Sequence, residues 1–286
     1  MAGLQVLWAA NHWPAAVAQH AANHPRTLHV CQDLQQADWS AVPRHDILMA
    51  SPACQGHAKA RGKERPHHDA SRSTAWAVVS ALEYHRSAMA VIENVPEMAS
   101  KWVLYPAWRS ALESLGYAVN EHLIDAADCG CAQNRLRLII TAVRAKHPLV
   151  LSPPPRREPV QARMVIDFKS GSWSDVLKPG RAPKTIDRWN AGIERFGERF
   201  VFSFYGKTTG GRSINRPIGT ITTRDRWAVV DGGRMRMVTV PEARDFMSFP
   251  ADYRLPGNNR VAMHMLGNAV PPLMAKHVLS QIVRAA

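Results

Sequence analysis

The sequence predicts an α/β fold, with a mostly parallel sheet covered by helices. In the first half of the chain, short apolar runs alternate with segments whose apolar residues recur at helical spacing. The 286 residues are 46 % hydrophobic, enough for a buried core, which excludes a wholly disordered chain. In sheets of this kind, chemistry gathers in the loops at the carboxyl ends of the strands.

The predicted elements follow in a regular order. Residues 4–9 form an apolar run that predicts a strand, and the Ala-rich segment 14–22 predicts a helix with proline in its first turn. The next expected elements are a strand over 45–50, a helix over 71–84, a strand over 89–92, a helix over 108–115 and a strand over 136–143. These alternations are typical of a sheet with crossover helices.

The pattern changes after residue 147. Five prolines lie in 148–159, and the segment 144–212 has 14 Lys and Arg against 6 Asp and Glu. Its periodicity is poor, so we expect a small, loop-rich, basic lobe. The Thr- and Val-rich residues 216–230 are strand-like, and 271–284 return to helical spacing.

Charge and cysteine content narrow the class of protein. The net charge is +13, which favours a polyanionic partner, most plausibly nucleic acid, over a generically basic protein. No stretch approaches 18 consecutive apolar residues, so we expect no membrane-spanning helix. Nor does the N-terminus have the pattern of a secretory signal. Four cysteines without a C-x-x-C pair indicate thiols in a reducing compartment.

One cysteine follows the predicted strand 45–50, in the segment Ser51-Pro52-Ala53-Cys54-Gln55. Four basic residues between 59 and 65 come next, and nearby positive charge lowers the pKa of a thiol and favours the nucleophilic thiolate. Cys54 is therefore a candidate nucleophile on an exposed loop. The alternative is a small buried cysteine with no chemical role.

Two other groups of polar residues accompany apolar strands. Glu93 and Asn94 follow the strand 89–92, where a carboxyl can act as an acid or base; the alternative is a carboxylate that begins a helix. Gln133, Arg135 and Arg137 alternate into the strand 136–143, so we expect them on one face. If buried, these arginines need anionic partners such as a phosphate or carboxylate, whereas on an edge strand they would be solvated.

Taken together and in order, these segments resemble the motifs of the cytosine-C5 DNA methyltransferase family. Residues 51–55 resemble its Pro-Cys-Gln nucleophile loop, Glu93-Asn94-Val95 matches its Glu-Asn-Val motif, and 133–137 match its Gln-x-Arg-x-Arg motif. Further along, 216–223 resemble its Arg-Pro…Thr-x-Thr segment, and 267–272 match its Gly-Asn-Ala-Val-Pro-Pro motif. The resemblance covers nearly the whole chain.

The resemblance implies a Rossmann-like S-adenosylmethionine-dependent methyltransferase sheet with helices on both faces, plus a smaller loop-rich target-recognition domain. The expected catalytic and cofactor domain spans 1–145 and is completed by 265–286. The expected target-recognition domain spans 146–264 and contains the basic lobe, which would grip phosphates and read base edges.

Catalytic roles follow from the resemblance. Cys54 would add to carbon 6 of a cytosine flipped out of duplex DNA, because a stacked base is out of reach. Glu93 would protonate or hydrogen-bond ring nitrogen 3, and Asn94 would brace the loop. Arg135 and Arg137 would hold the flipped nucleotide and the catalytic loop. The residues expected to bind the DNA substrate are Gln55, Gln133, Arg216, Thr222 and Thr223.

The implied cofactor is S-adenosyl-L-methionine. Trp13 would stack on the adenine, and the other residues expected around the cofactor are His12, Asp33, Leu34, Pro52, Asn268, Ala269 and Val270. The chain departs from the family at His12, where a glutamate is usual for the ribose hydroxyls, and at Ala53, which lengthens Pro-Cys by one residue. The family's first strand and Gly-rich cofactor loop have no counterpart in this sequence, so we expect an unpaired sheet edge.

That departure supports an alternative, a catalytically inactive or split DNA-binding relative that needs a complementing polypeptide. A second alternative is a metal-dependent nuclease or zinc module built from His57, His67, His68, Asp69, Cys129 and Cys131, although their spacing matches no zinc pattern. Cys31 or Cys129 as nucleophile is a third. We expect a monomer, double-stranded DNA as partner, no metal, no membrane, and a cytoplasmic, nucleoid-associated location in a bacterial or phage-infected cell.

Overall fold

The computed structural model describes residues 2–53, 73–204 and 211–285. The chain forms two compact units: unit 1 contains 1–124, 136–153 and 278–286, and unit 2 contains 125–135 and 154–277. This division differs from the sequence-based one, because 125–135 and 265–277 make their contacts in unit 2. The chain therefore crosses between the units four times.

Unit 1 contains two sheets. The larger has the order β3 (Ile47–Ala50), β4 (Met89–Asn94), β6 (Leu136–Val143) and β5 (Ala118–Asp125). Strands β3 and β4 are parallel, whereas β4 and β6 are antiparallel, so the expectation of a mostly parallel sheet was too simple. The helix α5 (Tyr105–Ser114) is followed by β5, and β5 and β6 are joined through unit 2 rather than by a crossover helix.

The smaller sheet pairs β1 (Trp8–Asn11) with β2 (Leu28–Cys31) in parallel, and α1 (Pro14–Asn23) connects them. Within the described residues, no backbone ladder joins this sheet to β3. Two short 3-10 helices, η1 (Leu34–Gln36) and η2 (Trp39–Ala41), lead from β2 to β3. The sequence predicted α1 closely and placed the first strand four residues too early.

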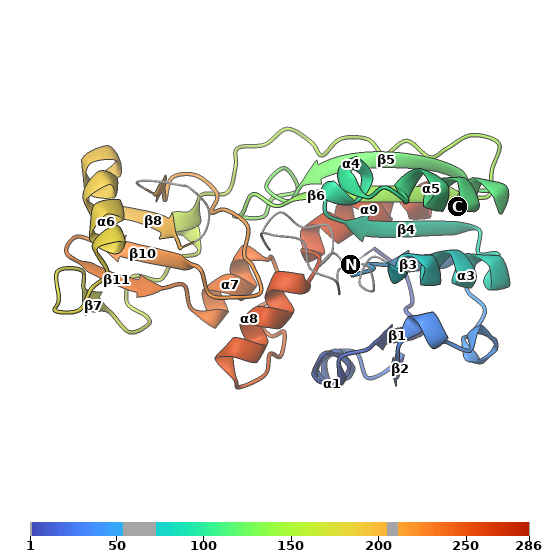
Figure 1. Ribbon diagram of the computed structural model, residues 1–286, viewed down its shortest axis with the longest axis horizontal. Helices are drawn as coiled ribbons and strands as arrows, with labels where there is room; N and C mark the ends of the chain where they lie inside the picture. The colour runs from blue at the N-terminus through green and yellow to red at the C-terminus, as the bar shows by residue number, and fades with distance from the viewer. Residues whose placement is uncertain (1, 54–72, 205–210, 286) are drawn as a thin grey trace. The chain divides into compact units, whose positions relative to one another are not determined.

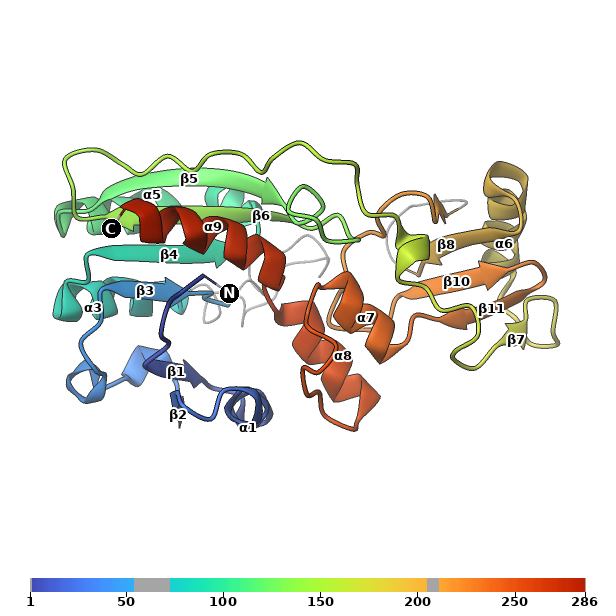
Figure 2. The ribbon, with the colours of Figure 1, turned by 180° about the vertical axis from the view of Figure 1, so that it is seen from behind.

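Helices cover both faces of the larger sheet. Figure 1 shows α4 (Glu97–Lys101) and α5 in front of it, and Figure 2 shows the unit 1 part of α9 (Pro272–Ala285) crossing the opposite face. Helix α3 (Trp76–His85) lies with α5 in one hydrophobic cluster. Two faces covered by helices are what a buried central sheet requires.

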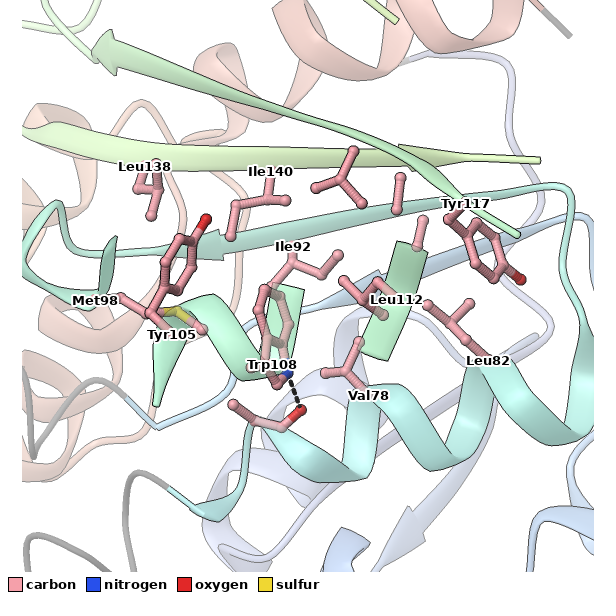
Figure 3. Close-up of a cluster of buried hydrophobic side chains, with 14 of the residues drawn as sticks. Val78, Leu82, Ile92, Met98, Tyr105, Trp108, Leu112, Tyr117, Leu138 and Ile140 are labelled. Atoms are coloured by element: carbon pink, nitrogen blue, oxygen red, sulfur yellow. Dashed lines mark hydrogen bonds between the residues drawn. The ribbon is translucent and has the colours of Figure 1, made fainter. Parts of the chain in front are cut away.

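The core of unit 1 lies between the sheet and helices α3 and α5 (Figure 3). Trp108 and Leu112 of α5 are fully buried and face Ile92 of β4 and Ile140 of β6, which are register partners. The Trp108 indole nitrogen donates a hydrogen bond of 2.9 Å to the Ala75 carbonyl. Burying an apolar side chain such as that of Leu112 contributes about 1.5–3 kcal/mol to the stability of the fold. This cluster therefore fixes the sheet that carries the candidate site.

Unit 2 is built on a five-stranded antiparallel sheet. Its order is β7 (Ser174–Asp175), β11 (Arg234–Met237), β10 (Trp227–Asp231), β8 (Arg199–Ser203) and β9 (Arg212–Ser213). The expected loop-rich lobe therefore contains more regular structure than its composition indicated. Phe200 and Phe202 face one cluster and Val201 faces the other, as strand alternation dictates.

Helix α6 (Pro183–Phe196) covers one face of this sheet, so closely that a Cβ on Gly192 would meet the Phe200 ring. The other face packs in a cluster with α7 (Val240–Phe246) and α8 (Asn259–Asn268). A 3-10 helix, η4 (Ala162–Met164), precedes the sheet. The elements of this unit missed by sequence reasoning are α6, α7, α8, β8 and β11.

Candidate active site

The segment after β3 is fixed at its start by unit 1. The Asn94 side-chain amide donates to the Pro52 carbonyl (3.1 Å), and its oxygen accepts from the Val95 amide (2.8 Å). The Ala53 amide donates to the Thr74 hydroxyl at 3.0 Å. The segment that leads into residue 54 and the one that follows residue 72 are therefore tied together. Cys54 and Gln55 themselves lie outside the described residues.

Glu93 and Arg137 form an ion pair on the larger sheet. Arg137 Nε lies 2.9 Å from Glu93 Oε1, and the two side chains are 12 % and 13 % exposed. Glu93 is the register partner of Ile139, so Arg137, two residues earlier on β6, is its diagonal neighbour on the same face. Arg137 thus has the carboxylate partner that the sequence required of a buried arginine. The pair fixes a carboxyl group at the carboxyl end of β4.

The smaller sheet supplies a different set of groups. Its parallel register pairs Asn11 with Cys31, so His12 and Trp13 emerge beside the residues that follow β2. The Trp13 ring is half-buried, and His12 and Asp33 are exposed. Asp33 also accepts from the Gln35 amide at the start of η1.

This donor set fits S-adenosylmethionine. An indole offers a stacking surface for adenine, and an imidazole and a carboxylate offer hydrogen-bond partners for ribose hydroxyls. Ser73, which follows the nucleophile segment, donates to the Gln35 side chain at 2.9 Å. The region after β2 therefore lies beside the region after β3, where Pro52 is placed.

The Gln-x-Arg-x-Arg segment divides between the two units. Strand β6 begins at Leu136, so Gln133 and Arg135 precede it, and both are buried in unit 2. The terminal nitrogens of Arg135 donate to the carbonyl oxygens of Ile221, Gly267 and Ala269 at 2.8–3.0 Å. Three carbonyl dipoles stabilise this guanidinium.

Gln133 is bound in the same way. Its side-chain oxygen accepts from the Ile221 amide (3.0 Å) and its nitrogen donates to the Phe246 carbonyl (3.0 Å). The three residues therefore do not share one strand face. Of this motif, only Arg137 is brought to Glu93.

The other predicted residues of unit 2 lie in or near the hydrophobic cluster that contains α7 and α8. Arg216 and Asn268 are exposed, and Ala269 and Val270 are half-buried at the end of α8. The Thr222 hydroxyl donates to the Arg224 carbonyl at 2.9 Å. Sequence reasoning missed the close approach of Gly267, where a Cβ would lie 2.3 Å from the Thr222 carbonyl carbon and the Thr223 nitrogen. The Gly-Asn-Ala-Val-Pro-Pro motif carried that signal.

Burial disfavours the thiolate form of two cysteines in unit 2, Cys129 and Cys131. Burial, with Cys131 nearby, raises the pKa of Cys129 to about 12, and burial raises the pKa of Cys131 as well. Both are therefore protonated thiols at neutral pH. In the part of the chain that the structure describes, no group of His, Cys, Asp or Glu is arranged to hold a metal ion. The histidines proposed for a metal site, with Asp69, lie outside those residues.

No helix among the described residues has both the length and the apolar character needed to span a membrane.

The family model for C-5 cytosine-specific DNA methylase matches residues 1–284. The chain is 25 % identical over 279 residues to the type II methyltransferase M.HgiDI of Herpetosiphon aurantiacus, covering 96 % of this chain and 85 % of that one. It is 24 % identical over 291 residues to M.HindV of Haemophilus influenzae, covering 99 % and 90 %.

Two solved structures share the fold. A putative DNA modification methyltransferase encoded within an E. coli prophage aligns with a TM-score of 0.71 at 18 % identity, covering 99 % of this chain and 93 % of that one. The Dnmt2 methyltransferase of S. pombe aligns with a TM-score of 0.66 at 14 % identity, covering 98 % and 91 %. These alignments confirm the predicted α/β methyltransferase fold class.

Proposed function

The chain belongs to the C-5 cytosine-specific DNA methylase family, and on that premise we propose how its residues divide the work of methylating carbon 5 of cytosine in duplex DNA. The protein is a DNA (cytosine-5-)-methyltransferase that uses S-adenosyl-L-methionine. Cys54 is the nucleophile, Glu93 is the acid, and Asn94 and Arg137 hold these two in place.

One observation carries this proposal. Glu93 and Asn94 are consecutive residues at the carboxyl end of β4, and the Asn94 side chain is bonded to the carbonyl of Pro52, two residues before Cys54. An acid and the stem of a nucleophile loop are thereby held together. This proximity matters because the acid must lie within hydrogen-bond reach of the same substrate that the nucleophile attacks.

The chemistry follows from the weak nucleophilicity of carbon 5. The Cys54 thiolate adds to carbon 6 of the cytosine, and Glu93 gives its proton to ring nitrogen 3, which receives the displaced electron pair as an N–H bond. Carbon 5 is then enamine-like and attacks an electrophile. S-adenosylmethionine supplies that electrophile, a sulfonium-bound methyl group.

The covalent adduct then breaks down. The proton on ring nitrogen 3 returns to Glu93. A base removes the carbon 5 proton, the electron pair re-forms the 5,6 double bond, and the sulfur–carbon 6 bond breaks to release the Cys54 thiolate. Throughout, Arg137 holds the Glu93 carboxyl in position through its charged hydrogen bond.

We assign the cofactor to the residues that the family resemblance indicates. His12, Asp33 and Leu34 bind the ribose and adenine, Trp13 stacks on the adenine ring, and Pro52 lies beside them. Asn268, Ala269 and Val270 are further cofactor-binding residues.

We assign the DNA to unit 2 and the nucleophile loop. The target cytosine leaves the stack, because its carbon 6 is inaccessible within the duplex. Its contacts come from Gln55, Arg216, Thr222 and Thr223, with the buried Gln133 and Arg135 in a supporting place. The basic residues of 156–212 bind phosphates and read base edges.

The protein acts as a monomer in the bacterial cytoplasm, associated with the nucleoid. One alternative, which the family match does not favour, is that cofactor binding needs a complementing polypeptide. Calorimetric titration of the 286-residue chain with S-adenosylhomocysteine distinguishes the two. Micromolar binding supports the monomer, whereas no binding by a chain with native circular dichroism supports the alternative.

A covalent trap tests the proposal. Fluorine at carbon 5 of cytosine leaves no proton to remove, so the adduct cannot break down and is retained on a denaturing gel. We expect the wild-type chain and the control Cys129→Ser to form an adduct with a 5-fluorocytosine duplex in the presence of S-adenosylmethionine. Cys54→Ser should form none. An adduct in Cys54→Ser would assign the nucleophile elsewhere.

A further inference from the structure

Residues 133–135 lie alongside residues 218–221 in unit 2. Gln133 and Ile218 form a parallel β-bridge, and the Asn134 amide donates to the Ile218 carbonyl at 2.8 Å. The Thr220 hydroxyl donates to the Asn134 carbonyl at 2.9 Å. The short segment before Thr222 is therefore aligned by backbone contacts with the Gln-x-Arg segment.

Two buried side chains then fix the end of that segment. Gln133 holds the Ile221 amide, and Arg135 holds the Ile221 carbonyl, so both polar backbone atoms of one residue are bound. Gln133 and Arg135 are 0 % and 2 % exposed. Hydrogen bonds to a charged group in such a dry environment are among the stronger ones in proteins.

The same arginine reaches the end of α8. It binds the carbonyls of Gly267 and Ala269, and Gly267 lies against the backbone of Thr222 and Thr223, where no Cβ would fit. One guanidinium therefore joins the end of α8 to the segment that precedes Thr222. We call this arrangement of Gln133, Arg135 and Gly267 the 133–267 clamp.

We propose that the 133–267 clamp positions Thr222 and Thr223 for the target nucleotide, so that Arg135 is a positioning residue for DNA binding, whereas Arg137 serves the chemistry at Glu93. This inference rests on the proposed function, which assigns Thr222 and Thr223 to the substrate. The two arginines of one motif then have separate tasks in separate units.

Two variants disturb the clamp from different sides. Arg135→Lys keeps the charge but replaces the planar, two-pronged donor by a single ammonium group, which cannot reach all three carbonyls. Gly267→Ala leaves Arg135 intact and pushes on the Thr222–Thr223 backbone. Both should raise the KM for a cytosine-containing duplex by roughly tenfold, the scale of one lost charged hydrogen bond, with a smaller change in kcat.

Matched controls are available in the same unit. Arg244, outside the DNA-binding range 156–212, also donates to a backbone carbonyl, that of Ala251, so Arg244→Lys tests the loss of such a contact elsewhere. A Cβ on Gly233 would meet nothing within 4 Å, so Gly233→Ala tests the glycine substitution itself. Both controls should leave the KM for DNA within threefold of wild type.

Amide hydrogen exchange gives a readout that does not depend on methylation. Both clamp variants should speed exchange in peptides covering 218–224, and the two controls should not. Faster exchange without a rise in KM would overturn the proposal. So would a fall in kcat at constant KM, which would place Arg135 in the chemical step. Absence of methylation by the wild-type chain would instead count against the proposed function.

Discussion

Glu93 in unit 1 and Glu242 in unit 2 are both paired with an arginine, yet the two carboxylates are held in different ways. Glu242 is 4 % exposed and accepts five hydrogen bonds, two from Arg236, two from Thr239 and one from the Asp167 amide. Within the described residues, the structure gives Glu93 one such contact, with Arg137. Glu242 is saturated, whereas Glu93 keeps acceptor capacity.

This difference separates a structural acid from a reactive one. A saturated, buried carboxylate contributes to the fold and has no position left for a substrate atom. A carboxylate with one fixed partner is oriented and can still bind or transfer a proton. The spare capacity at Glu93 among the described residues supports the acid role that we propose for it.

The largest effect that we expect from this contrast between Glu93 and Glu242 is on catalysis. Glu93→Gln removes the transferable proton and keeps the shape of the side chain, so kcat should fall by roughly 10²–10⁴-fold, the range of general acid–base catalysis. Unfolding in urea should show a smaller loss of stability than Glu242→Gln, because the substituted amide still offers Arg137 a neutral acceptor. Single-turnover methylation of a radiolabelled duplex measures the first quantity. A near-normal rate would remove Glu93 from the chemistry.

The next effect is on stability. Glu242→Gln leaves the Arg236 charge buried without its partner, and breaking such a pair costs about 3–5 kcal/mol. Urea unfolding should show this loss of stability. Titration with S-adenosylhomocysteine at low urea concentration should measure how much cofactor binding the variant retains. The double variant R236M/E242L, which removes both charges, should recover part of the loss. A single variant as stable as wild type would show that Glu242 does not stabilise the fold.

The smallest expected effect concerns acid. In unit 1, His20 lies 2.7 Å from His29, and burial together with His24 and His29 lowers its pKa from 6.5 to about 4. Between those pH values the unfolded chain binds the proton more readily than the folded one, so stability is lost as pH falls through this window. The protection of amides in α1 and β2 against hydrogen exchange, corrected for the pH dependence of intrinsic exchange, should fall from pH 7 to 5.

His20→Gln is the control for that measurement, because glutamine does not titrate. It should flatten the pH dependence of exchange in α1 and β2. An unchanged slope would show that another group is responsible. Peptides of unit 2 around Glu242 provide an internal reference in the same experiment.

Local pattern predicted the elements that carry their own signal. The apolar run of β6 was placed at its observed bounds, and α9 was placed within one residue at each end. In α6, the apolar residues Ile186, Trp189, Ile193 and Phe196 recur at helical spacing, but the surrounding prolines, glycines and charges obscured them. Composition describes a whole segment, whereas helix formation depends on spacing within it.

Strand direction and arginine partners could not be predicted from the sequence. The antiparallel pairing of β4 and β6 depends on a connection that passes through unit 2, which spacing alone does not reveal. Arg135 and Arg137 have the same spacing and the same chemistry, so only the fold decides which one meets Glu93. The carbonyl oxygens that hold Arg135 come from residues more than 80 positions away.

The 133–267 clamp binds mostly backbone groups. This has a consequence for exchanging target specificity between related enzymes. Gln133 and Arg135 bind the amide or carbonyl groups of Ile221, Phe246, Gly267 and Ala269, and every residue type carries a carbonyl. Apart from Met247, whose sulfur lies 2.8 Å from the Gln133 side-chain nitrogen, side chains across 154–266 can therefore be replaced without removing the groups that the clamp grips. A chimaera that takes 154–266 from a relative and keeps 125–135 and Gly267 would preserve this junction, so target preference is free to diverge while the junction is retained.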